Sequence, residues 1–99
     1  MVDTAYELNG TRFVWDEDKA RANVAKHRVS FEDVATAFFD PLLRIEDASV
    51  DEEARDALIG FDEKQRLLYV VHIEVEDEHI RIISARRATS EERRRYDNQ

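Results

Sequence analysis

The chain has 99 residues, of which 42% are hydrophobic, and a formal net charge of -8 at pH 7. This length allows one small domain, residues 1–99, with one modest core. The sequence has no cysteine, which excludes disulfides and thiolate metal sites, and no segment approaches the ~18 apolar residues of a membrane span. We therefore expect a soluble, cytoplasmic protein that does not contact a membrane.

The first half of the chain predicts one strand and two helices. Residues 12–15, RFVW, favour a strand, and Asp16 can cap a helix that runs to about His27. On this helix Ala20, Val24 and His27 share one stripe, with Asn23 alongside. Ser30 and Asp33 resemble a capping box that starts a second helix, with apolar residues at helical spacing from Phe31 to Phe39. It ends before Pro41, since the residue that precedes a proline disfavours helical geometry.

The second half changes to the two-residue period of strands. The predicted strands are LLRIED (42–47), ARDALIGF (54–61), RLLYVVHIEV (66–75) and HIRIISARRA (79–88). Thr89 then opens a T-x-x-E capping box for a short last helix. The predicted fold class is α+β, with two N-terminal helices packed on an antiparallel β-sheet and a short C-terminal helix.

The last two predicted strands form a hairpin. With a three-residue turn, residue 72 pairs with residue 82, and alternation then places His72, Ser84 and Arg86 on one face. The opposite face, which contains Tyr69, is more apolar, so we expect it to take the two helices. The face with His72, Ser84 and Arg86 carries polar groups in its middle, as expected of a functional surface. A turn one residue longer or shorter would shift the register by one residue and place Ser84 and Arg86 on the opposite face from His72.

Charge is segregated along the chain. Residues 19–28 contain four basic residues and no acidic one, and residues 81–95 contain six basic residues against two acidic ones. Acidic residues gather instead in 46–56 and 74–78. A surface divided in this way can present a local cationic site for phosphate on an anionic protein, because salt screens distant charges. The alternative is that both basic stretches are ordinary solvated faces.

Several spaced motifs follow one another from Phe13 to Tyr96: FVWDEDKARANVAKHRVSF, FFDPL, RDALIG, RLLYVVH and RIISARRATSEERRRY. This succession resembles the BrnT family of type II toxins. Two places depart from the family pattern. Asp56 stands where an apolar or aromatic residue is expected, and Glu63-Lys64-Gln65 replaces a turn that often contains glycine.

The resemblance implies a fold similar to that of RelE/ParE toxins and a ribonuclease that arrests translation. It also implies a BrnA-like ribbon-helix-helix antitoxin as the partner, with operator DNA bound only through the complex of the two proteins. The RNA substrate completes the set of expected partners, and we expect neither a cofactor nor a metal.

Metal-independent RNA cleavage requires a proton acceptor, a proton donor and stabilisation of phosphoryl charge. We predict that Arg86 stabilises this charge with assistance from Arg55 and Lys26, while His27 and His72 compete for the acid-base role. A further set of basic residues is expected to bind the RNA backbone: Lys19, Arg81, Arg87, Arg93 and Arg94, with Arg95 completing the last basic run.

Each of these residues also has a purely structural interpretation. Arg86 can form a structural ion pair, His27 can cap a helix, and His72 can be an ordinary histidine at the edge of the core. Two alternative functions follow. The first is a non-catalytic, ParE-like binding module that acts through protein contacts, and the second is a protein whose arginines only neutralise acidic loops.

Overall fold

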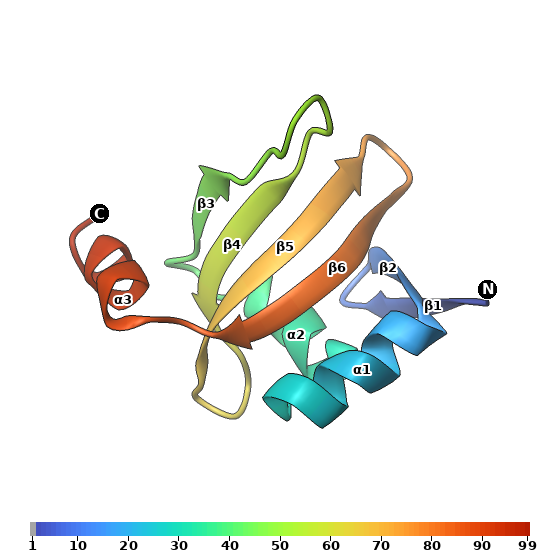
Figure 1. Cartoon of the computed structure of the whole chain (residues 1–99), viewed down its shortest axis with the longest axis horizontal. Coiled ribbons are helices and arrows are strands. Elements are labelled where there is room, and N and C mark those ends of the chain that lie inside the picture. Colours follow the sequence, from blue (N-terminus) through green and yellow to red (C-terminus); the bar gives the residue numbers. More distant parts are fainter. Residues whose placement is uncertain (1) are drawn as a thin grey trace.

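The structure is a computed structural model that describes residues 2–99, which form six strands and three helices (Figure 1). In chain order the elements are β1 (Asp3–Leu8), β2 (Thr11–Asp16), α1 (Glu17–His27), α2 (Phe31–Ala37), β3 (Arg44–Asp47), β4 (Asp56–Phe61), β5 (Leu67–Val75), β6 (His79–Arg87) and α3 (Ser90–Asp97). The α+β class is confirmed. The prediction missed β1, whose short, mainly polar sequence DTAYEL carries little strand signal.

The six strands of the described chain form one mixed sheet in the order β1-β2-β6-β5-β4-β3. All neighbours are antiparallel except β2 and β6, which pair in parallel through Phe13 with Ile80 and Val14 with Arg81. The prediction of two N-terminal helices packed on an antiparallel sheet is therefore wrong. The additional strand β1 makes a hairpin with β2, and β2 then joins β6 after a long crossover, as parallel pairing requires.

A bulge in β6 changes which side chains share a face. Val75 pairs with His79 and His72 with Ile82, as predicted. The register then shifts by one residue, so that Val71 pairs with Ser84 and Tyr69 with Arg86. Because an extra residue inverts the alternation of a strand, Ser84 and Arg86 lie on the Tyr69 face and not on the His72 face. Their predicted placement beside His72 is wrong.

The helices also occupy other positions than predicted. α2 packs on the His72 face, where Phe31 and Val34 join Leu68 and Val70 in the main core. α3 packs on the opposite face, where Tyr96 contacts Ile59 and Leu67. Figure 1 shows α2 behind the strands and α3 beyond the end of β6. The Tyr69 face is therefore covered only at one end, and Ser84 stays exposed.

Tyr96 fixes α3 to the loop that follows α2. Its hydroxyl donates a hydrogen bond of 2.7 Å to Asp40 Oδ2, and the same carboxylate oxygen accepts the Phe61 amide at 2.8 Å. Burial, followed by this hydrogen bond, raises the pKa of Tyr96 to about 12. The contact ties the C-terminal helix to both α2 and β4.

Candidate functional site

The helix α1 is held at both ends by its own sequence. Asp16 accepts the amides of Asp18 and Lys19 at 2.8 and 3.0 Å, which is an N-cap. At the other end Arg28 adopts a left-handed conformation with φ 61° and returns its amide to Val24 O. Lys26 and His27 occupy the last turn, where the helix dipole favours positive charge.

Asn23 joins α1 to β6 where β2 no longer covers the strand. Its Oδ1 accepts the Ala85 amide at 3.1 Å, and its Nδ2 donates to Val29 O at 2.9 Å. The side chain is buried. The Asn23 side chain thus accepts a hydrogen bond from β6 that the backbone of a neighbouring strand would otherwise accept, and it holds α1 beside the bulge.

A groove of about 210 Å³ lies between α1 and β6. Its lining residues are Lys19, Ala22, Asn23, Lys26, His27, Ile83 and Ser84. In the described part of the chain neither Lys19 nor Lys26 makes an ion pair. The residues that line the groove thus include two lysines, a histidine and a serine but no acidic residue, so every ionisable group beside the groove is basic.

Arg86 lies on the same face as Ser84, two residues further along β6. Its guanidinium donates to both carboxylate oxygens of Glu92, at 2.8 and 2.9 Å, and stacks 4.5 Å from the centre of the Tyr69 ring. The hydrogen bond from Arg86 lowers the pKa of Glu92, and the same bond raises the pKa of Arg86. The sequence allowed a structural ion pair between Arg86 and the acidic segment; the structure shows an ion pair, but its partner is Glu92 of α3, which occupies the fork of Arg86.

The other predicted catalytic residues are not all gathered at this place. His72 is 3% exposed on the α2 face, where its ring lies 4.9 Å from that of Phe38, and burial lowers its pKa. Arg55 precedes β4 and donates to Glu53 at 3.0 Å. Arg55 precedes Asp56, which pairs with His72, whereas Arg86 pairs with Tyr69, so four residues of β5, about 13 Å, separate the levels of the two arginines.

Of the residues predicted to bind the RNA backbone, Lys19 lines the groove and the other four lie outside it. Arg81 pairs with Asp3 at 2.6 Å across the sheet, and this contact raises the pKa of Arg81. Arg93 lies 5.6 Å above the ring of Phe61. Arg87 and Arg94 are exposed, and within residues 2–99 they have no ion-pair partner. The arginines without an ion-pair partner in the described chain therefore lie at the end of β6 and on α3.

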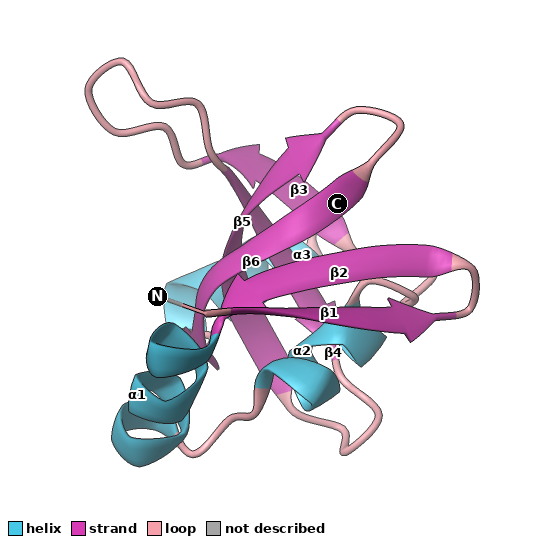
Figure 2. Cartoon of the chain, turned by 90° about the vertical axis from the view of Figure 1, so that its right-hand side faces the viewer, coloured by secondary structure: helices cyan, strands magenta, loops and turns pink. Residues whose placement is uncertain are grey.

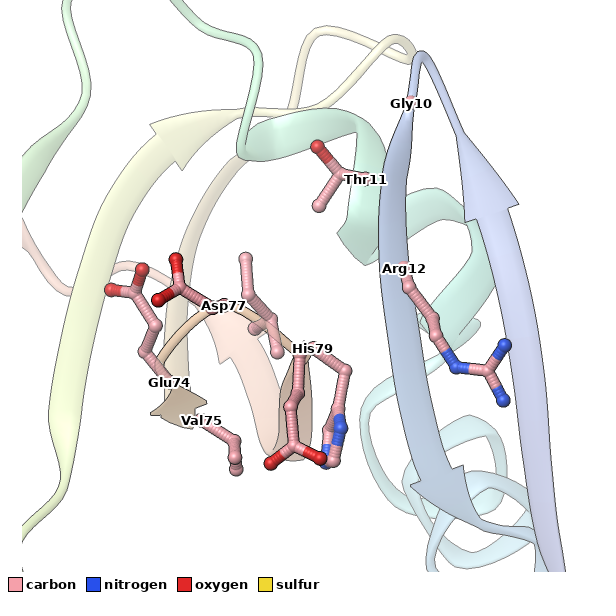
Figure 3. A pocket seen from close by; sticks show the side chains of 9 residues that line it. Gly10, Thr11, Arg12, Glu74, Val75, Asp77 and His79 are labelled. Atoms are coloured by element: carbon pink, nitrogen blue, oxygen red, sulfur yellow. The ribbon is translucent and has the colours of Figure 1, made fainter.

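A larger cavity, of about 380 Å³, lies between the β1–β2 and β5–β6 turns. Figure 3 shows the carboxylates of Glu74 and Asp77 on one side and Arg12 pointing away from it. Among the described residues no three histidine, cysteine or acidic side chains are grouped to hold a metal ion. Because its lining is acidic, this cavity repels phosphate, and the groove beside α1 remains the candidate site.

Comparison with known proteins identifies the family. Residues 15–92 match the sequence model described as "Ribonuclease toxin, BrnT, of type II toxin-antitoxin system". The chain belongs to the BrnT family. A solved structure similar to this chain is the 1.1 Å crystal structure of the Brucella abortus ribonuclease toxin BrnT, with a TM-score of 0.57 and 26% sequence identity. The match covers 77% of this chain and 94% of the Brucella chain. No curated protein matches the sequence.

Membership of the BrnT family confirms the resemblance stated from the sequence. It makes the chain a member of a family of ribonuclease toxins of type II toxin-antitoxin systems, and such a toxin implies an antitoxin partner. No helix in residues 2–99 is long and apolar enough to cross a membrane. The matched range contains the groove on α1 and β6 together with Arg86 and Glu92.

Two polar residues that organise this site were not predicted from the sequence. Asn23 was grouped beside the apolar stripe of α1, although a buried amide there can satisfy a strand edge. Glu92 was recognised as part of a capping box, which the structure confirms, but its second role as the partner of Arg86 was not. One signal existed for Glu92: it follows Arg86 by six residues across a short connection.

Proposed function

We propose that this BrnT toxin is an endoribonuclease that cleaves RNA without a metal ion and thereby inhibits translation. The observation that carries the proposal is the groove between α1 and β6. It gathers Lys19, Lys26, His27 and Ser84 on a protein of net charge -8. A positively lined groove on an acidic protein concentrates a phosphate chain at one place.

The chemistry assigned to the groove is attack of the ribose 2′-OH on the adjacent phosphorus, which forms a 2′,3′-cyclic phosphate and breaks the bond from phosphorus to the 5′-oxygen. His27 takes the proton from the 2′-OH and gives a proton to the departing 5′-oxygen, which leaves as a 5′-hydroxyl, because an imidazole can both accept and donate a proton. Lys19 and Lys26 offset the charge that develops on the phosphoryl oxygens. Arg86, two residues from Ser84 along β6, can bind phosphate directly when Glu92 leaves its guanidinium.

Of the remaining predicted residues, three arginines have a supporting role in this proposal and the others have none. Arg87, Arg93 and Arg94 lie along the end of β6 and on α3, where they can bind the RNA backbone beyond the groove. Arg55 and Arg81 are engaged by Glu53 and Asp3. His72 is left out of the proposed site because it is buried on the other face of the sheet.

The partners in the proposal are a BrnA-like ribbon-helix-helix antitoxin, which neutralises the toxin in the cytoplasm, and operator DNA, which only the complex binds. Induced expression with and without the antitoxin, followed by mapping of RNA ends, tests the function. We expect growth arrest that the antitoxin relieves, and 2′,3′-cyclic phosphate ends that form equally in the presence of a chelator. Ends bearing a 3′-hydroxyl, or cleavage that the chelator stops, would contradict the mechanism.

The Arg86–Glu92 pair favours a second candidate function, a non-catalytic binding module of the same fold. An arginine that holds a carboxylate in bidentate geometry has no donor left over for phosphate at those positions. This module would bind its antitoxin with full affinity and leave RNA intact. Incubation of the purified chain with RNA, with antitoxin binding measured on the same preparation, separates the two functions.

A further inference from the structure

Strand β3 forms one edge of the sheet, and its outer side is open in the described chain. Its register pairs Glu46 with Ala57, and in the same register the Ala48 amide donates to Arg55 O at 2.9 Å. Hydrogen-bonded pairs alternate along an antiparallel ladder, so the even-numbered residues of β3 bond to β4. The N–H and C=O groups of Ile45 and Asp47 therefore point outward, where they can pair with another chain.

Exposed apolar side chains accompany this edge. Phe39, Leu42 and Ile45 are 39%, 65% and 49% exposed, and they are three of the six large hydrophobic residues exposed in residues 2–99. All three fall within residues 39–45, which run from the loop after α2 into β3. The Phe39 ring lies 6.4 Å from the ring of Phe13 in β2, so Leu42 and Ile45 are the two that belong to the β3 end of this segment. Ile45 points to the α2 side of the sheet, because it pairs with the core residue Leu58. Apolar surface thus adjoins free backbone groups.

Acidic side chains border the same edge. Asp47 at the end of β3 is exposed, and so are Asp51, Glu52 and Glu53 in the loop that follows, while the one arginine of this loop, Arg55, is paired with Glu53. Figure 2 shows this β3–β4 loop projecting from the body of the sheet. A partner segment that adds to β3 therefore meets negative charge beside apolar contacts, and RNA is repelled from it.

The opposite edge of the sheet lacks these features. In β1, Leu8 pairs with Thr11 across the tight Asn9-Gly10 turn, so the outward backbone groups are those of Asp3, Ala5 and Glu7. None of these three side chains is large and apolar. Both edges have free hydrogen-bonding groups, but β3 alone of the two combines them with apolar surface inside its own strand.

We propose that the antitoxin docks by adding an extended segment to the outer edge of β3, with apolar side chains over Leu42 and Ile45 and basic side chains facing the acidic loop. The segment thus combines main-chain hydrogen bonds with side-chain specificity, which is how β-strand addition recognises peptides. The inference rests on the proposed function only for the existence of the antitoxin partner. It does not depend on RNA cleavage.

The substitution Ile45→Pro tests this docking mode. It removes the outward N–H and the exposed side chain, but it leaves the ladder to β4 in place, since edge strands tolerate proline when its nitrogen faces solvent. The probe is the antitoxin encoded by the reading frame that adjoins the toxin's own, purified with the full toxin chain. We expect binding at least about tenfold weaker and growth arrest that this antitoxin no longer relieves.

Ala5→Pro is the matched control, because it makes the same backbone change at an outward position of the opposite edge. It should leave antitoxin binding unchanged. Should Ile45→Pro fail to fold, as thermal unfolding would reveal, Ile45→Lys keeps the backbone and opposes a basic segment by charge. Antitoxin binding by that variant at the wild-type affinity would overturn the proposal.

Hydrogen exchange of the wild-type complex gives a second, direct readout. We expect the amides of Ile45 and Asp47 to become protected when the antitoxin binds, because they enter a new ladder. Unchanged exchange at both amides, as docking of a helix would produce, would overturn strand addition. Both measurements need no nuclease activity, so a toxin that binds antitoxin through β3 but leaves RNA intact would refute the proposed function and leave this inference standing.

Discussion

At the residue scale, the proposed chemistry depends most on Lys26 and His27 in the last turn of α1. Lys26→Gln removes a charge next to the groove and His27→Gln removes the imidazole ring. We expect each to reduce RNA cleavage by about 10²–10⁴-fold, the usual range for a lost acid-base or charge-stabilising group. Cleavage rates of the purified proteins on one RNA measure the effect.

Arg21 provides the control for this pair of variants. It lies on the same helix, is exposed, and is absent from the groove lining. Arg21→Gln makes the same charge change as Lys26→Gln, so it should retain cleavage within a few-fold of wild type. Equal losses in Arg21→Gln and Lys26→Gln would show that net charge, and not the groove, controls the rate.

A second residue-scale prediction concerns Glu92, which holds the guanidinium of Arg86. Glu92→Gln weakens that hold, while glutamine still serves at this position of a capping box. Arg86 is 39% exposed and Glu92 10%, so we expect a loss of about 1 kcal/mol in the free energy of unfolding. RNA binding should become about fivefold tighter if the released Arg86 accepts phosphate.

Glu91→Gln is the matched change for this experiment. Glu91 is an exposed neighbour on α3 whose contact with Arg95 is 3.6 Å long. It should leave RNA affinity and stability near the wild-type values. Tighter RNA binding in both variants would reflect net charge alone, and unchanged binding in Glu92→Gln would favour the non-catalytic candidate.

At the element scale, local sequence signals were enough to find most helices and strands. Asp16, Ser30 and Thr89 cap the three helices as predicted, and each accepts a backbone amide through its side chain. The hairpin turn was also predicted with the right parity, since Val75 pairs with His79. These features involve residues within a few positions of one another, and such short-range chemistry is visible in one sequence.

The arrangement of the elements was less predictable because it depends on contacts between distant residues. The bulge at Ile83 leaves no mark in the alternation of RIISARR, yet it moves Arg86 to the other face of the sheet. The parallel contact of Phe13 with Ile80 joins residues far apart in the chain. The candidate site was therefore predicted in part: Lys26 and His27 share the groove, whereas Arg86 lies near it and His72 does not.

The helix α1 carries the clearest conflict between pattern and structure, and it yields a prediction. Val24 was expected in the apolar stripe but is 44% exposed, whereas Asn23 is buried against β6. Asn23→Leu leaves the Ala85 amide and Val29 carbonyl without this partner, so we expect unfolding to become easier by about 2–4 kcal/mol. Chemical denaturation measures the change.

Val24→Ala, one position along the same helix, is the control for Asn23→Leu. Its free energy of unfolding should change by less than about 0.5 kcal/mol, as is usual for exposed sites. Asn23→Leu should also reduce RNA cleavage, because α1 carries Lys26 and His27 beside β6. A stable Asn23→Leu protein with full activity would show that the amide does not position the helix.

At the scale of the whole molecule, charge and fold are arranged together. Lys19 and Lys26 of α1 line the groove beside β6, while acidic residues fill the β3–β4 loop and the β5–β6 turn. Figure 1 shows that this loop and this turn lie at the same end of the sheet. RNA is therefore drawn to one part of the surface, and the acidic end remains available to a basic protein partner.

The same separation of charge predicts a loss of stability in acid. Lowered pKa values at Asp40 and Glu92 mean that the folded protein holds these carboxyl groups ionised, through the Phe61 amide and Arg86 respectively. Their stabilisation is complete above the unfolded-state values of about 4, and it is lost as pH falls through the lower folded-state values. His72 acts in the same direction at higher pH, because burial lowers its pKa and the unfolded chain takes up the proton more readily.

We therefore expect two steps when the free energy of unfolding is measured from pH 8 downward. A shallow decline begins below about pH 6.5, where the unfolded His72 binds a proton, and a steeper one begins near pH 4, where the carboxyl groups do. His72→Gln should remove the first step and keep the second, since glutamine does not titrate. A decline below pH 6.5 that persists unchanged in His72→Gln would show that another group causes it, and that the α2 face does not keep His72 neutral.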